Sequence, residues 1–369
     1  MRQVRAVTRI GRDERRRDTL AVVAPGTQLR DGLERILRGN TGALIVLGYD
    51  DVVQQICSGG FELDAAFSPT RLRELAKMDG AIVLDPATGR IVRAAVQLVP
   101  DARLPTAESG TRHRTAERVA AQTGLPVITV SKSMRTIAVF TGGTRYVLED
   151  SAALLARAHQ ALGMLERYRR RLDDAASRLS AGEIEDRVTA ADVAQVAQRL
   201  EMVGRVADEI AGYLVELGTD GGLLALQLEE LTTGTSRERD LLLRDYASGS
   251  AGMAGAGPGM AGAGPGTVGA LSADELLDLA AVATAIGLDP ACGLDQHVAA
   301  RGYRLLGRVP GLAGESADLL IAHFGGLQKL LSASVQDLCE AGGLDVAQAR
   351  SLREGLSRLA ESALLERYP

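Results

Sequence analysis

The spacing of apolar residues along the chain changes near residue 150. Before that point, short continuous apolar runs such as Ala43–Leu47 and Ile82–Leu84 lie next to glycines and polar turns. Runs of this length are typical of buried strands. A helix is expected at residues 28–37, where the apolar residues fall on one face. We therefore predict a mixed sheet flanked by helices over residues 19–149.

Other segments of this first domain follow from the same reasoning. Strands are expected at residues 52–56, 91–99, 126–130, 136–140 and 145–148, with a helix at residues 71–78 and a hairpin turn at Gly142-Gly143. Residues 1–18 are rich in arginine, and we expect a frayed or extended basic leader there. A basic arm that contacts nucleic acid is the alternative.

After residue 150 the apolar residues recur at helical spacing, which predicts an all-α spine over residues 150–299. Its exposed arginines, such as Arg170 and Arg171, are expected to be solvated, with a DNA-facing flank as the alternative. Within it, residues 249–269 consist mainly of glycine, alanine and proline. Such a composition cannot bury enough surface to offset its chain entropy, so we expect a linker.

Residues 300–369 are expected to form a small all-α domain. Val309-Pro310-Gly311-Leu312-Ala313-Gly314 lies between two helical stretches, and Ala341-Gly342-Gly343-Leu344-Asp345 repeats the arrangement. Both segments resemble helix-hairpin-helix motifs, whose glycine turns expose backbone N–H groups that bind DNA phosphate. The candidate DNA-binding residues are Arg308, Gly311, Gly314 and Gly343, with further positive charge from Arg304 and Lys329. Asp345 weakens the second motif, because it places an acid where a phosphate would bind.

Composition limits the possible partners. The net charge is −5, so DNA binding has to come from a local site. No apolar run is long enough to span a membrane, and no secretory signal is present. The three cysteines are isolated, which suits a reducing cytoplasm. We therefore expect a cytoplasmic protein without a membrane partner.

The candidate chemistry lies in two short segments of the first domain. Asp79-Gly80-Ala81 precedes a strand, and Gly110-Thr111-Arg112-His113-Arg114 begins a helix. A helix N-terminus favours an anion, and guanidinium groups form paired bonds with phosphate oxygens. An exposed basic helix start and a turn-forming aspartate are the simpler interpretation. The pairing of the two segments favours a phosphate site.

Together these segments resemble the signature of the diadenylate cyclase family, in the form that carries a C-terminal helix-hairpin-helix domain. The resemblance covers nearly the whole chain. It implies condensation of two ATP molecules into cyclic di-AMP and pyrophosphate, regulation by branched or junction DNA, and a part in DNA damage signalling. It also implies a homo-oligomer, in the family an octamer.

The resemblance also implies roles for individual residues. Catalytic roles fall to Asp79, Arg112, His113 and Arg114, and ATP-binding roles to Gly80, Ala81, Leu98, Gly110, Thr111 and Ser131. Asp79 is the candidate ligand of Mg²⁺ or Mn²⁺. Two alternatives stay open: a nucleotide-sensing protein that binds branched DNA without cyclase activity, and a different nucleotidyltransferase or phosphohydrolase.

Overall fold

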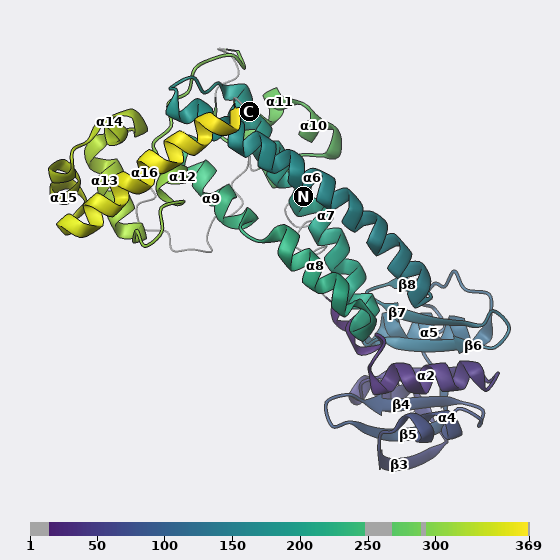
Figure 1. The fold of residues 1–369 in the computed structure, drawn as a ribbon. Helices are drawn as coiled ribbons and strands as arrows, with labels where there is room; N and C mark the ends of the chain where they lie inside the picture. The colour runs from purple at the N-terminus through teal and green to yellow at the C-terminus, as the bar shows by residue number, and fades with distance from the viewer. Residues whose placement is uncertain (1–14, 248–267, 289–292, 368–369) are drawn as a thin grey trace. The chain divides into compact units, whose positions relative to one another are not determined.

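The computed structural model describes residues 15–247, 268–288 and 293–367 (Figure 1). Backbone contacts divide the chain into two compact units. Unit 1 comprises Met1–Gln160 and Ile210–Leu226, and unit 2 comprises Ala161–Glu209 and Gln227–Pro369. Each unit is described by itself below.

Unit 1 contains an eight-stranded mixed sheet in the order β2-β5-β4-β1-β6-β7-β8, with β3 paired to β5. The strands are β1 (Ala43–Leu47), β2 (Cys57–Ser58), β3 (Phe61–Ala66), β4 (Ala81–Asp85), β5 (Arg90–Leu98), β6 (Val127–Ser131), β7 (Thr136–Thr141) and β8 (Thr144–Val147). The central pair, β1 and β4, is parallel, and the other pairs are antiparallel.

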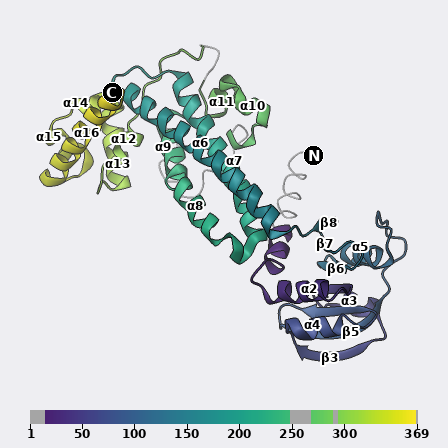
Figure 2. The same cartoon turned by 45° about the vertical axis from the view of Figure 1, so that its right-hand side comes forward.

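Helices cover both faces of the sheet, which explains why its central strands are apolar without interruption. The helices are α2 (Gln28–Arg38), α3 (Asp51–Ile56), α4 (Pro69–Leu75) and α5 (Thr111–Thr123). One core contains Leu33 of α2 and Ile45 of β1, together with residues of α4 (Figure 2). The other contains Val46 of β1 with Val119 of α5. Successive residues of β1 therefore enter opposite cores.

Two predictions for unit 1 were wrong. The strand expected at residues 52–56 is helix α3, because the Asp50 side chain caps it by accepting a bond of 2.8 Å from the backbone N–H of Val53. The leader is not extended throughout, since residues 15–22 are helical and Leu20 is buried in the sheet core. Residues 1–14 lie outside the described part.

The rest of the chain is mainly helical, as predicted for the spine. The elements are α6 (Ser151–Ile184), α7 (Ala190–Leu217), η1 (Gly218–Gly221), α8 (Gly222–Thr232), α9 (Thr235–Tyr246), η3 (Val268–Ala270), α10 (Ala273–Leu277) and α11 (Leu279–Ala285). Most of the predicted linker, residues 249–267, lies outside the described residues. Ser272 and Glu275 form a capping box at the start of α10.

The C-terminal region consists of α12 (Tyr303–Leu306), α13 (Gly314–Phe324), α14 (Leu327–Ser332), α15 (Val335–Gly342) and α16 (Val346–Arg367). The predicted fold class, an α/β domain followed by helical regions, is confirmed. Within the described ranges, every helix is too short or too polar to cross a membrane.

Candidate functional site

The sheet topology brings the two predicted motifs to the same edge. Ile45 of β1 pairs with Ile82 of parallel β4, while Val96 of antiparallel β5 lies opposite Ala81 and Val130 of antiparallel β6 lies opposite Ala43. The amino ends of β1 and β4 therefore share an edge with the carboxyl ends of β5 and β6. We call this the nucleotide edge.

Asp79 and Gly80 lie at this edge, directly before β4. Gly80 has a φ of +112°, and a Cβ atom there would lie 2.5 Å from the carbonyl carbon of Ala95 in β5. Only glycine allows this close approach. Asp79 is exposed beside it, whereas Ala81 is fully buried in the core. We therefore assign Ala81 to packing, not to contact with a ligand through its side chain.

Helix α5 begins at the same edge, because it leads through a short turn into the start of β6 at the opposite edge. Its N-cap is Gly110, which has no side chain to bond the first N–H groups. Thr111, Arg112 and Arg114 are exposed in the first turn. Among the described residues, the side chains of Asp79, Arg112 and Arg114 form no hydrogen bond or ion pair with the protein.

The position of Arg112 identifies a residue that sequence reasoning missed as part of the site. A Cβ atom at Gly42 would lie 2.3 Å from Nη1 of Arg112. The guanidinium of Arg112 therefore lies directly against the backbone before β1. Nothing near Gly42 in the sequence indicates this contact.

His113 faces inward at the start of α5. Its ring centroid lies 6.4 Å from that of Phe140, and its buried Nε2 has no hydrogen-bond partner in the described structure. Burial lowers the pKa of His113, with Arg145 and Arg112 acting in the same direction against Glu108. The lowered pKa favours the neutral imidazole, and its Nε2 is a buried polar atom without a partner among the described residues.

The loop before α5 is fastened to the helix that it precedes. The carboxylate of Glu117 accepts bonds from the hydroxyl of Thr106 and, at 3.1 Å, from the N–H of Ala107. Arg118 donates to the carbonyl of Leu104 at 2.9 Å. These contacts fix the backbone that ends at Gly110, so the first turn of α5 is preorganised.

Leu98 and Ser131 end β5 and β6 at the nucleotide edge, but both are buried. Ser131 Oγ accepts a bond of 3.3 Å from the N–H of Met134, so it holds the following turn. The exposed apolar residues at this edge include Val99 and Met134, at 58% and 51% exposure, and Met78. Beside the buried Leu98, the side chain open to a ligand is therefore that of Val99.

A metal site made of protein groups alone is not found: the described residues contain no cluster of three His, Cys, Asp or Glu side chains. Mg²⁺ commonly uses one or two carboxylates together with substrate phosphates. The single exposed carboxylate of Asp79 at the nucleotide edge fits that pattern.

The two predicted hairpins differ at the start of their second helices. In the first, α13 has Ala313 as N-cap and no side-chain cap, and Gly311 before it has a φ of +81°. In the second, Asp345 caps α16 by accepting a bond of 2.7 Å from the N–H of Gln348. The start of α16 thus has one N–H bonded to an acid, whereas the start of α13, which begins at Gly314, has no side-chain cap.

Arg304 does not supply surface charge, contrary to our expectation. It is 1% exposed and lies in a cluster of polar side chains from α6, α9 and α12, which we call the buried ion cluster. Its guanidinium donates to Glu183 at 2.6 Å and to Glu238 at 2.7 Å. Tyr246 donates to the same oxygen of Glu183 at 2.7 Å. Arg308 is 37% exposed and 3.8 Å from Glu238.

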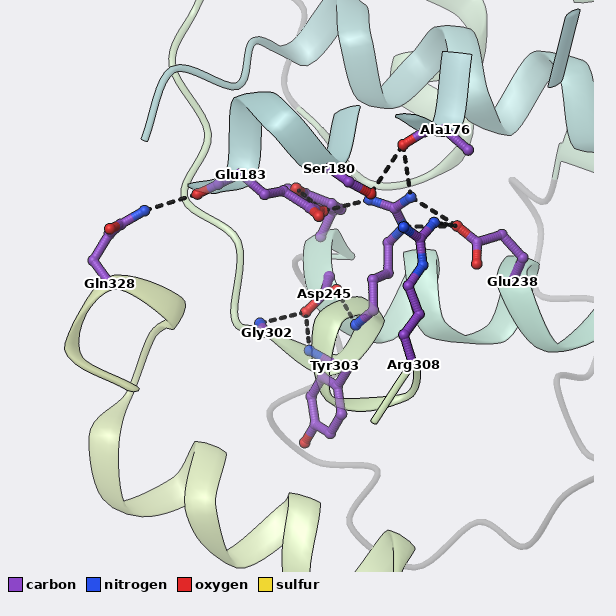
Figure 3. Close-up of polar contacts among 11 residues, drawn as sticks. Ala176, Ser180, Glu183, Glu238, Asp245, Gly302, Tyr303, Arg308 and Gln328 are labelled. Atoms are coloured by element: carbon purple, nitrogen blue, oxygen red, sulfur yellow. Dashed lines mark hydrogen bonds and ion pairs between the residues drawn. The ribbon is translucent and has the colours of Figure 1, made fainter. Parts of the chain in front are cut away.

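Asp245 completes the buried ion cluster. Its carboxylate accepts bonds of 2.7, 2.7 and 2.8 Å from the N–H groups of Gly302, Tyr303 and Arg304 (Figure 3). These are the orphan donors at the start of α12. Burial, aided by the negative charge of Glu183, raises the pKa of Asp245 to about 7 against the effect of these bonds.

Two family models match the chain. Residues 30–145 match one described as the DisA bacterial checkpoint controller nucleotide-binding region, and residues 148–293 match the DisA bacterial checkpoint controller linker region. The solved structure of DacA from Staphylococcus aureus has 22% identity and a TM-score of 0.30, covering 36% of this chain and 88% of that one. That likeness is too weak to support an argument.

Curated relatives match almost the full length. The DNA integrity scanning protein DisA of Acidothermus cellulolyticus is 59% identical, covering 97% of this chain and 96% of the relative. The protein of the same name from Frankia alni is 60% identical, covering 95% and 97%. That from Kineococcus radiotolerans is 59% identical, covering 96% and 98%. By identity and coverage, the chain belongs to the DisA family of bacterial checkpoint controllers.

Proposed function

We propose that the chain is a diadenylate cyclase that joins two ATP molecules into cyclic di-AMP and releases two pyrophosphates. The main observation is the nucleotide edge, where an exposed carboxylate, a helix start without a side-chain cap and two unpaired guanidiniums meet. The family model for residues 30–145, described as nucleotide-binding, supports the same assignment.

In this reaction the 3′-hydroxyl of one nucleotide attacks the α-phosphorus of the other, and the bond to pyrophosphate breaks. Negative charge builds up on the phosphate oxygens, so fixed positive groups accelerate the step. Arg112, Arg114 and the free N–H groups of α5 provide them. Neutral His113 lies inward behind this turn and positions it, and Thr111 contributes its hydroxyl.

Asp79 has two possible tasks at this site. It orients the attacking hydroxyl, or it holds Mg²⁺ or Mn²⁺ together with the phosphates of ATP. A bound metal ion would supply neutralisation of phosphate charge. Gly80 keeps Asp79 next to the backbone of β5, so the carboxylate has a fixed starting point in either case.

Cyclisation needs two nucleotides, so we propose that two copies of the α/β domain face each other across their nucleotide edges. The exposed apolar side chains of Val99, Met134 and Met78 at this edge support such contact, since apolar groups at an edge of charged residues suit a covered surface. We propose a homo-oligomer built on this pair, with the octamer of the family as its largest form.

We further propose that the C-terminal helices bind branched or junction DNA and that bound DNA lowers the cyclase rate. The N–H groups at the start of α13, which begins at Gly314 and follows the turn at Gly311, suit a DNA phosphate without reading bases. Arg308, half-exposed at the end of α12, adds a positive charge. The names of the relatives, which refer to DNA integrity scanning, support this partner.

Incubation with ATP and Mg²⁺ or Mn²⁺, followed by chromatography with mass detection, tests the cyclase proposal. Cyclic di-AMP with pyrophosphate would support it. A steeper than linear dependence of rate on protein concentration would support paired domains. ADP alone, or no product at any protein concentration, would overturn the proposal in favour of a nucleotide-sensing DNA-binding protein. A rate indifferent to saturating junction DNA would overturn the coupling alone.

A further inference from the structure

An open hollow of about 510 Å³ lies on the C-terminal helix, away from both glycine turns in sequence. Its lining consists of Val335 of α15 and five polar residues of α16: Arg350, Arg353, Glu354, Ser357 and Arg358. The five residues of α16 share one helix face, because they follow the spacing i, i+3, i+4, i+7 and i+8 from Arg350. We call this the arginine face of α16.

The arginine face is not needed for packing. In the part of α16 whose side chains are described, the buried residues are Ala349, Leu352, Gly355 and Leu356, which lie on the other side of the helix, while the three arginines are exposed. Gly355 brings that other side close to the first hairpin, since a Cβ atom there would lie 3.1 Å from Cγ1 of Val309. The arginine face therefore belongs to the same packed module as the first glycine turn.

The charge of this face is poorly neutralised by the protein. Within the described ranges, Arg350 and Arg353 form no ion pair, and Arg358 makes only a long bond of 3.4 Å to the carbonyl of Glu354. Three guanidiniums face one carboxylate in the lining, in a chain whose net charge is −5. Unpaired arginine in an acidic protein favours a local anionic partner.

We propose that the arginine face binds the phosphate backbone of duplex DNA. In the second hairpin, these side chains would contact DNA instead of the backbone N–H groups of the glycine turn. This inference rests on the proposed DNA binding and deepens it. In the second hairpin, the Asp345 carboxylate accepts a bond from the N–H of Gln348, and the Gln348 side chain accepts one from the N–H of Asp345. The start of α16 is therefore capped by side chains and carries an acid, whereas the start of α13 has no side-chain cap. The positive groups of the second hairpin lie instead along α16.

The size and chemistry of the face suit a duplex. Residues 350 to 358 span about 12 Å of helix, which matches about three phosphates of one strand at 3.4 Å each along the axis. Guanidinium forks and the Ser357 hydroxyl are suited to phosphate oxygens. The lining contains no aromatic side chain on which the bases of a single strand would stack.

The test measures binding of the full-length protein to a fluorescent duplex over a series of salt concentrations. In the triple variant Arg350→Gln, Arg353→Gln, Arg358→Gln, we expect the slope of log affinity against log salt to become shallower by about one per lost contact. Affinity at low salt should fall at least about tenfold. The triple Arg→Lys variant retains the charge and should keep most of the slope.

A matched control removes equal charge elsewhere in the same unit. Arg170, Arg171 and Arg178 of α6 are also exposed, and their triple change to Gln should leave the slope nearly unchanged. Equal losses in both triple variants would overturn the inference, because they indicate diffuse attraction. Retained slope in the α16 variant would overturn it while leaving DNA binding by the first hairpin. Failure of the unaltered protein to bind duplex or junction DNA would overturn the DNA-binding proposal as well.

Discussion

The nucleotide edge and the buried ion cluster contain the same residue types, arginine and acidic residues, but these residues have different roles in the two places. At the edge, Arg112 and Arg114 are exposed and have no side-chain partner in the part of the chain that the structure describes, and Asp79 is exposed at the same edge. In the cluster, Arg304 is almost fully buried and bonded to two carboxylates. Charges that the fold neutralises stabilise it, whereas charges left open are available to a ligand. Whether an arginine stabilises the fold or is available to a ligand therefore depends on its protein partners and not on its residue type.

The largest effect is expected on the cyclase rate, from replacing the exposed carboxylate of Asp79. Asp79→Asn should lower cyclic di-AMP formation by about 10²–10⁴-fold, because the variant can neither accept the hydroxyl proton nor neutralise a metal ion. Product formation is followed by mass detection, and binding to junction DNA serves as the control that should persist. Normal turnover would remove Asp79 from the mechanism.

Arg304, the buried arginine of the ion cluster, should affect the stability of the fold. Arg304→Ala leaves Glu183 buried without its cation and should lower the free energy of unfolding by about 3–5 kcal/mol. Arg308→Ala is the matched control, since Arg308 is half-exposed and 3.8 Å from Glu238; it should cost less than about 1 kcal/mol. Urea unfolding measures both. Similar losses of unfolding free energy in the two variants would contradict a stabilising role for the buried ion pairs of Arg304.

A smaller effect is expected from the glycine beside Asp79. Gly80→Ala should cost about 1–3 kcal/mol and displace Asp79, because its Cβ atom meets the backbone of Ala95 and its φ is positive. Gly89→Ala tests the φ alone: Gly89, in the connection between β4 and β5, has a φ of +64° but open space around it. Thermal melts should show the larger loss for Gly80→Ala, with a reduced cyclase rate in that variant only.

The smallest effect concerns pH. The pKa of Asp245 is raised to about 7, so its folded form binds a proton more tightly than the unfolded chain does. Its contribution to stability is therefore full below about pH 4 and is lost as pH rises toward 7 and above. Unfolding free energies measured from pH 5 to pH 8 should fall less steeply in Asp245→Asn than in the unaltered protein. Parallel curves would mean that Asp245 is charged throughout.

Much of the fold was predictable from local patterns, but not its tertiary pairings. The apolar runs located β1 and β4 because both faces of those strands are buried. Strand β3 was missed: Glu62 and Asp64 make it polar, and only its pairing with β5 makes it a strand. Residues 52–56 contain β-branched valines that suggest a strand, but the cap from Asp50 decides for a helix.

The site shows the same limit. Its two motifs could be located from residue types in short segments, and the structure places both at one edge. The contact between Gly42 and Arg112 joins segments 70 residues apart and leaves no local signal. Arg304 was taken for a surface cation because its partners Glu183 and Glu238 lie 121 and 66 positions away. The predicted boundaries of the three regions stay predictions.

The buried ion cluster also bears on how separable the parts of this protein are. Arg304 follows the boundary that one would choose for removing the C-terminal region, yet it neutralises Glu183 in α6 and Glu238 in α9. Asp245 likewise has its donors in residues 302–304. A chain cut before residue 300 would retain these carboxylates without their partners. Such a chain would differ from the whole protein in the stability of its helical spine as well as in DNA binding. The spine and the C-terminal helices therefore do not act as independent modules.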